Sequence, residues 1–141
     1  MVTILGAEIG FVSTDRRLVD FLAQVFELDE DLPIEVDAEI MEQLPAARPS
    51  IQYRLQARDG LILKVTVPEA EPRPDNIADH VLAGTGLRYV TLAVTDLDGV
   101  VARARKLGGS IEQSPIAVTG ARLALIRDPD GNLYELAEIP S

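Results

Sequence analysis

The sequence contains no cysteine. That absence excludes disulfide bonds, thiolate metal ligands and a cysteine nucleophile. It also favours a cytoplasmic location, because disulfides belong to oxidising compartments. Histidine occurs once, as His80, so a site built from several imidazole ligands is excluded too.

Basic residues are also scarce, with 13 against 23 acidic residues, which gives a net charge of −10. A surface of this charge repels phosphate backbones and anionic lipid, so we expect neither nucleic acid nor a membrane as partner. No apolar run approaches the roughly 18 residues of a membrane-spanning helix. The first ten residues have no basic start and include Glu8, which is not typical of a signal peptide.

What the sequence does contain is an internal repeat. The segments Glu8–Asp15 (EIGFVSTD) and Tyr89–Asp96 (YVTLAVTD) are both short apolar strands that end in Thr-Asp. Each precedes a segment whose apolar residues recur with the spacing of one helix face. These residues are Leu18, Phe21, Leu22, Val25 and Phe26 in the first copy, and Leu97, Val100, Val101, Ala104 and Leu107 in the second. We expect Asp15 and Asp96 to cap the two helices, because a carboxylate there accepts backbone N–H groups of the first turn.

Each predicted helix is followed by a predicted hairpin. In the first copy, Ser50–Ala57 alternates apolar and polar residues and leads through the turn Arg58–Gly60 into Leu61–Val67. The equivalent segments of the second copy are Ala121–Arg127, Asp128–Gly131 and Asn132–Glu138. Asp-Pro and Asp-Gly steps are strong turn signals. Each copy therefore has the order β-α-β-β, with room for one more strand before the hairpin.

The first copy is longer because of an acidic segment, Leu28–Pro49. It can contain a short helix from Asp37 to Leu44, since Pro45 would end it. This segment is either a lid over a site or a plain excursion on the surface. Residues 69–86, rich in proline, glycine and charge, have the composition of a linker and include His80. We expect one α+β domain over residues 1–141, with module one at about 1–68 and module two at 87–141.

A strand ending in aspartate, an amphipathic helix and the segment Arg127–Leu136 (RDPDGNLYEL) together resemble the vicinal oxygen chelate superfamily. This superfamily includes glyoxalase I, extradiol dioxygenases, methylmalonyl-CoA epimerase and the fosfomycin- and bleomycin-resistance proteins. The resemblance extends over nearly the whole chain. It implies two tandem βαβββ modules that form a curved, cup-shaped, mostly antiparallel sheet. It also implies a small-molecule ligand or substrate in the cup, often a divalent metal, and a homodimer.

The resemblance also marks four positions where the metalloenzymes of the superfamily carry ligands. These lie seven residues before the aspartate that opens each helix and four residues after the turn glycine of each last hairpin. In this chain they are Glu8, Lys64, Tyr89 and Glu135. The metalloenzymes typically carry histidine at the first-strand positions and an acid at one or both hairpin positions. Only Glu135 fits that pattern fully.

Two interpretations of this set remain open, and a lysine among the four favours a degenerate site without metal or other cofactor. Lys64 would lie between Glu8 and Glu135, with Tyr89 hydrogen-bonded to the cluster, because buried charges must be paired. The chain would then be a binding or resistance-type protein. If it is an enzyme, a glutamate would abstract a proton beside a carbonyl, with Lys64 or Tyr89 stabilising the enolate oxygen of an isomerase, epimerase or lyase reaction.

The alternative is a metal-dependent isomerase, lyase or dioxygenase in which Glu135, Glu8 and Tyr89 hold Mg, Mn, Fe or Zn. A third interpretation is an interaction module with a collapsed cup. Arg122 and Arg127 flank the last hairpin and either bind a substrate carboxylate or are simply solvated. Tryptophan is absent, so a small, polar-aliphatic ligand is favoured over a large stacked one.

Overall fold

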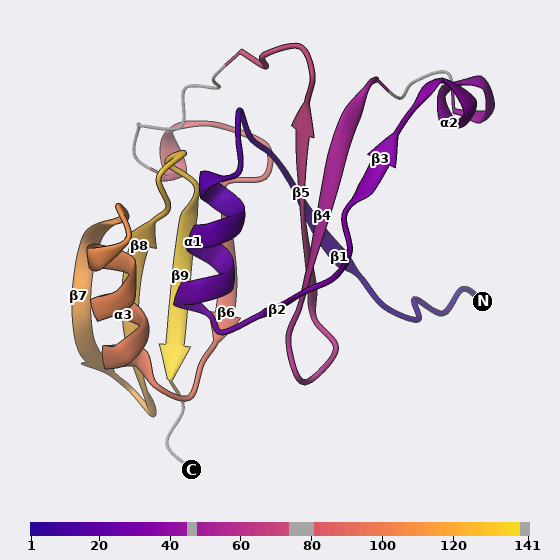
Figure 1. Cartoon of the computed structure of the whole chain (residues 1–141). Helices are drawn as coiled ribbons and strands as arrows, with labels where there is room; N and C mark the ends of the chain where they lie inside the picture. Colours follow the sequence, from indigo (N-terminus) through magenta and orange to yellow (C-terminus); the bar gives the residue numbers. More distant parts are fainter. Residues whose placement is uncertain (45–47, 74–80, 139–141) are drawn as a thin grey trace. The chain divides into compact units, whose positions relative to one another are not determined.

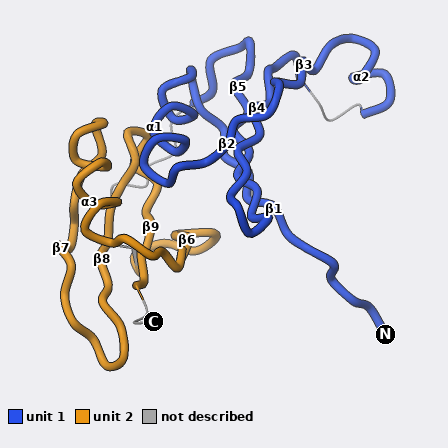
Figure 2. The backbone as a smooth tube through the Cα atoms, turned by 60° about the horizontal axis from the view of Figure 1, so that its bottom comes forward, with its two compact units in different colours: residues 1–73 blue, residues 74–141 orange. Residues whose placement is uncertain are grey.

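The computed structural model describes residues 1–44, 48–73 and 81–138 (Figure 1). The chain divides into two compact units, residues 1–73 and 74–141 (Figure 2). The division falls within the segment that the sequence marks as a linker. The sequence assigned a helix stop to Pro45 and a linker position to His80. Both residues lie outside the described residues. None of the described helices has both the length and the apolar character needed to span a bilayer.

Unit 1 is a sheet with two helices. Its elements are β1 (Glu8–Val12), α1 (Arg17–Val25), β2 (Asp29–Glu30), β3 (Ile34–Val36), α2 (Ala38–Gln43), β4 (Ser50–Gln56) and β5 (Ile62–Pro68). The strands are ordered β1-β5-β4-β2, and β3 also pairs with β4. β1 runs parallel to β5, and every other pairing is antiparallel.

One face of the unit 1 sheet is apolar and the other is polar and open. The apolar stripe of α1 is buried, and α1 contacts β4. On the strands, Leu55, Leu63 and Val65 are buried, while Glu8 and Gly10 on the opposite face are exposed. This difference follows from the alternation of side chains along a strand.

Unit 2 repeats the same plan without the insertion. After a short 3-10 helix, η1 (Val81–Ala83), its elements are β6 (Tyr89–Ala93), α3 (Leu97–Lys106), β7 (Ser110–Val118), β8 (Ala121–Arg127) and β9 (Leu133–Glu138). The strand order is β6-β9-β8-β7, with β6 parallel to β9 and the rest antiparallel. Helix α3 contacts β7, β8 and β9 and buries its apolar stripe.

The α+β class and the two βαβββ modules agree with the sequence prediction. The described strands form two sheets, one in each unit. In each unit the first strand pairs in parallel with the last strand of the same unit.

The acidic segment Leu28–Pro49 adds an edge to the sheet of unit 1. Its strands β2 and β3, whose positions the sequence did not give, both pair with β4. The predicted short helix is present as α2, capped by the Asp37 carboxylate, which accepts a hydrogen bond from the Ile40 N–H. No residue of α2 is buried, so this helix lies on the surface. A lid role for the segment stays a prediction.

The helix caps differ between the two units. Asp96 caps α3 as predicted, because its carboxylate accepts a hydrogen bond from the Gly99 N–H at 3.1 Å. The N-cap position of α1 is Arg16, which makes no side-chain cap. The Asp15 carboxylate, one residue earlier, accepts hydrogen bonds from the side chain of Arg17 and from its backbone N–H, which is the first of the helix, so the expected contact with the first turn is present.

The last hairpin turn is organised by one buried carboxylate, Asp128. It accepts hydrogen bonds from the Tyr134 hydroxyl at 2.7 Å, from the side chain of Asn132 at 2.9 Å and from the Asp130 N–H at 2.9 Å. Gly131 completes the turn with a φ of 90°, which favours glycine. Desolvation raises the pKa of Asp128 and raises the pKa of Tyr134 well above its ordinary value. The turn residues therefore serve structure, as the sequence indicated.

Candidate functional site

The first and last strands of unit 1 bring Glu8 and Lys64 together. In the parallel β1–β5 pair, Lys64 lies opposite Gly10. Glu8 is two residues before Gly10 on β1, so its side chain lies on the same open face of the sheet. The Lys64 Nζ atom lies 3.6 Å from the Glu8 Oε2 atom. Two of the four positions taken from the superfamily pattern are therefore in contact within this unit.

Arg54 joins this pair, although sequence analysis did not single it out. It lies in β4 directly opposite Lys64, and its Nη2 atom donates a hydrogen bond of 2.6 Å to Glu8 Oε1. The sequence did carry a signal for it. Apolar and polar residues alternate along Ser50–Ala57, which places Arg54 on the sheet face away from the buried Leu55. We call Glu8, Arg54 and Lys64 the charged cluster; their side chains are 33%, 28% and 29% exposed.

The charged cluster carries more positive than negative charge. The hydrogen bond from Arg54 lowers the pKa of Glu8 most, and the charges of Arg54 and Lys64 lower it further. Glu8 is therefore ionised at neutral pH and faces two cations. One negative and two positive charges leave the cluster with an excess of one positive charge.

The surface beside the cluster is open because of Gly10. A Cβ atom added to this glycine would meet no other atom within 4 Å. Gly10 has no positive φ, so no unusual backbone conformation explains the choice of glycine there. The absent side chain leaves space on the sheet directly beside Lys64.

In unit 2, Glu135 has a different environment. It lies in β9 opposite Thr91 of β6, and the Thr91 hydroxyl donates a hydrogen bond of 3.2 Å to Glu135 Oε1. Its other cross-strand neighbour is Leu125, and Leu133 and Ala137 share its face. Glu135 is thus a half-buried carboxylate on a mainly apolar face.

Tyr89 lies on that face at the edge of the sheet. It pairs with Leu133, two residues from Glu135 along β9, and it is 52% exposed. The hydroxyl that binds Glu135 comes from Thr91 rather than from Tyr89. Of the cluster predicted from sequence, the contact between Glu8 and Lys64 is present in unit 1, whereas Glu135 and Tyr89 belong to unit 2.

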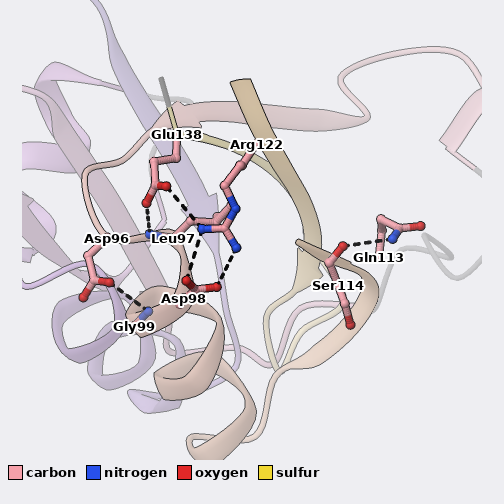
Figure 3. A network of polar contacts seen from close by, with 8 residues as sticks. All are labelled: Asp96, Leu97, Asp98, Gly99, Gln113, Ser114, Arg122 and Glu138. Carbon is pink, nitrogen blue, oxygen red and sulfur yellow. Dashed lines mark hydrogen bonds and ion pairs between the residues drawn. The ribbon is translucent and has the colours of Figure 1, made fainter. Parts of the chain in front are cut away.

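The two arginines that flank the last hairpin are held by the protein's own carboxylates. Arg122 donates to both oxygens of Asp98, at 2.9 and 3.1 Å, and to Glu138 at 3.3 Å (Figure 3). Arg127 pairs with Glu112 and donates to the Gly131 carbonyl. These contacts give both arginines a structural role at the start of α3 and around the hairpin turn.

The metal that the superfamily implies is a poor fit to the residues of unit 1. Both Glu8 oxygens already face cations. The other superfamily ligand position in this unit is Lys64, whose ammonium group would repel a divalent ion. Glu135 and Tyr89 supply oxygen atoms in unit 2. Over the described ranges 1–44, 48–73 and 81–138, no three or more His, Cys, Asp or Glu side chains are grouped so that they could hold a metal ion.

Comparison with known proteins agrees with this architecture. The family model of the Glyoxalase/Bleomycin resistance protein/Dioxygenase superfamily matches residues 11–136. A glyoxalase family protein from Bacillus cereus has a similar structure, with a TM-score of 0.78 and 20% identity over 99% of this chain and 97% of that one. No curated protein matches the chain by sequence.

Two further solved structures are similar. TioX from Micromonospora sp. ML1 gives a TM-score of 0.60 and 25% identity over 96% of this chain and 97% of that one. The fosfomycin resistance protein FosX from Mesorhizobium loti gives 0.60 and 20% identity over 95% and 91%. The chain belongs to the glyoxalase/bleomycin resistance protein/dioxygenase superfamily, whose members share the vicinal oxygen chelate fold.

Proposed function

We propose that this protein binds a small molecule on its open sheet faces and that the binding requires no divalent metal. The observation that carries this proposal is the charged cluster. An ammonium and a guanidinium group contact Glu8, and Glu8 and Lys64 occupy two of the four positions that the resemblance marks as metal ligands. Because like charges repel, these two groups favour a cation-free site.

The surface around these residues supports binding rather than a collapsed interior. Gly10 leaves open space beside Lys64, and the face around Glu135 offers apolar contacts with one carboxylate. A few polar groups on an apolar surface are typical of small-molecule sites. The absence of tryptophan favours a small, polar-aliphatic ligand. If the ligand is turned over, Glu135 is the residue we assign as the general base.

The wider setting of this proposal is a cytoplasmic homodimer. The lack of cysteine supports the location, and membership of the superfamily supports the assembly. Sedimentation or light scattering on the purified protein would measure the oligomeric state directly.

Metal analysis combined with ligand binding tests the proposal. We expect the purified chain to contain no stoichiometric divalent ion, and we expect ligands found by native mass spectrometry to bind equally before and after treatment with a chelator and dialysis. A stoichiometric ion whose removal abolishes ligand binding would defeat the proposal. Loss of that ion in Glu135→Gln or in Glu8→Gln would then support the metal-dependent isomerase, lyase or dioxygenase and would show which carboxylate the ion needs.

A further inference from the structure

We infer that Arg54 and Lys64 recognise an oxyanion of the bound molecule, a carboxylate or phosphoryl group, and that Glu8 is the internal counter-ion which this oxyanion replaces. This inference rests on the proposed function, because it names the chemical class of the ligand at the same site. It gives the excess positive charge of the charged cluster a binding role.

The pairing of the two cations is the first reason. Arg54 and Lys64 are directly opposite each other in the antiparallel β4–β5 pair. Like charges in this arrangement destabilise a sheet. Glu8 offsets part of that repulsion, but one carboxylate cannot neutralise two cations. Glu8 is the carboxylate that pairs with both of these cations.

The donors that remain are the second reason. Arginine has five N–H donors and lysine has three. Glu8 accepts one hydrogen bond from Arg54 at 2.6 Å, while its distance of 3.6 Å from Lys64 exceeds that of a good hydrogen bond. A planar guanidinium beside an ammonium is suited to bind the two oxygens of a carboxylate or phosphoryl group.

The third reason is access. Gly10 is the register partner of Lys64, and the position of its absent side chain is empty to 4 Å. Arg54 and Lys64 are also only partly exposed, so their charges are screened less than those of fully exposed side chains. A small anion can therefore approach the cations over Gly10. The strongly negative charge of the whole chain disfavours polyanions such as nucleic acids.

An NMR titration of the full ¹⁵N-labelled chain tests this inference. Acetate and inorganic phosphate are added separately at constant ionic strength to protein that has been treated with a chelator and dialysed. The two probes distinguish a carboxylate from a phosphoryl ligand, and acetamide serves as the neutral analogue of acetate. We expect saturable shifts of the amides of β1, β4 and β5 with at least one anion and no such shifts with acetamide.

Substitutions locate the binding. The double variant Arg54→Gln/Lys64→Gln should weaken anion binding about 10-fold or more, as expected for loss of charge-assisted hydrogen bonds. Its matched control is Arg105→Gln/Lys106→Gln, which removes the same charge from α3 in unit 2 and should leave the affinity unchanged. Equal weakening in both double variants would mean non-specific ionic attraction and would overturn the inference.

Two single variants test the roles of the neighbours. Glu8→Gln should raise the anion affinity several-fold, because the internal competitor is removed. Gly10→Val should block binding while leaving the unfolding midpoint unchanged, since its side chain enters open space and valine favours strands. Unchanged anion affinity in Glu8→Gln would refute the role of Glu8 as counter-ion.

The outcomes separate this inference from the proposed function. If the co-purifying ligand still binds Arg54→Gln/Lys64→Gln as tightly as the natural protein, the inference fails and metal-independent binding stands. If ligand binding needs a metal while the anion titration behaves as described, the proposed function fails and the anion site stands.

Discussion

Tyr134 donates its hydroxyl hydrogen to Asp128 across 2.7 Å, and both side chains are buried, at 0% and 3% exposure. Replacing Tyr134 by phenylalanine removes this donor while Asp128 stays desolvated. We expect the free energy of unfolding in urea to fall by about 1–3 kcal/mol. Tyr89→Phe is the control, because Tyr89 is 52% exposed, and it should change stability by less than about 0.5 kcal/mol. Equal stability of the two variants would contradict this role.

The same tyrosine predicts how stability changes at alkaline pH. Burial raises the pKa of Tyr134 well above its ordinary value of about 10. Below pH 10 or so, both the folded and the unfolded state keep the phenolic proton. Above that pH the unfolded chain releases the proton and the folded chain keeps it, so stability falls as the pH rises. Urea unfolding from pH 8 to 11 should show this loss, and Tyr134→Phe should lack that component.

Glu8 should titrate below its ordinary range, with Arg54 as the main cause. Its folded-state pKa is lowered, so its contribution to stability is present above the unfolded pKa and is lost as the pH falls through the folded value. An NMR titration of the Glu8 carboxylate carbon measures this pKa. Arg54→Gln should raise it more than Lys64→Gln, because the hydrogen bond from Arg54 is the largest cause. The reverse order would show that Lys64 dominates the cluster.

The start of α3 should depend on Glu138 more than on Asp98. Glu138 accepts a hydrogen bond of 2.7 Å from the N–H of Leu97, the first residue of the helix (Figure 3). Glu138→Ala should lower the free energy of unfolding by about 1 kcal/mol, as for loss of a helix cap. Asp98→Ala should cost much less, because the Asp98 side chain is 71% exposed. Hydrogen exchange at the Leu97 amide should quicken in Glu138→Ala and stay near its normal rate in Asp98→Ala.

The repeat was predictable from sequence because each part of it has a local cause. Thr-Asp strand ends, apolar stripes and Asp-Gly turns act within a few residues, and they specify each βαβββ module. The sequence left room for one more strand before the hairpin, but strands β2 and β3 could not be located from it for the opposite reason. They are two and three residues long and acquire strand geometry by pairing with β4, which lies far along the chain.

The charged cluster was only partly predictable. Strand periodicity and the superfamily pattern indicated Glu8 and Lys64, but the contact of Arg54 with Glu8 joins residues 46 positions apart. It depends on the register of β4 against β5 and of β5 against β1, which the sequence does not state. The same limit applies to Arg122, whose partners Asp98 and Glu138 are 24 and 16 residues away.

The pairing of every described strand with strands of its own module has a consequence for how this protein can change. Each module keeps its apolar core on one face of its sheet and leaves the opposite face to vary. Substitutions on the charged face of the first module can therefore change its chemistry while the strand pairings of the second module stay the same.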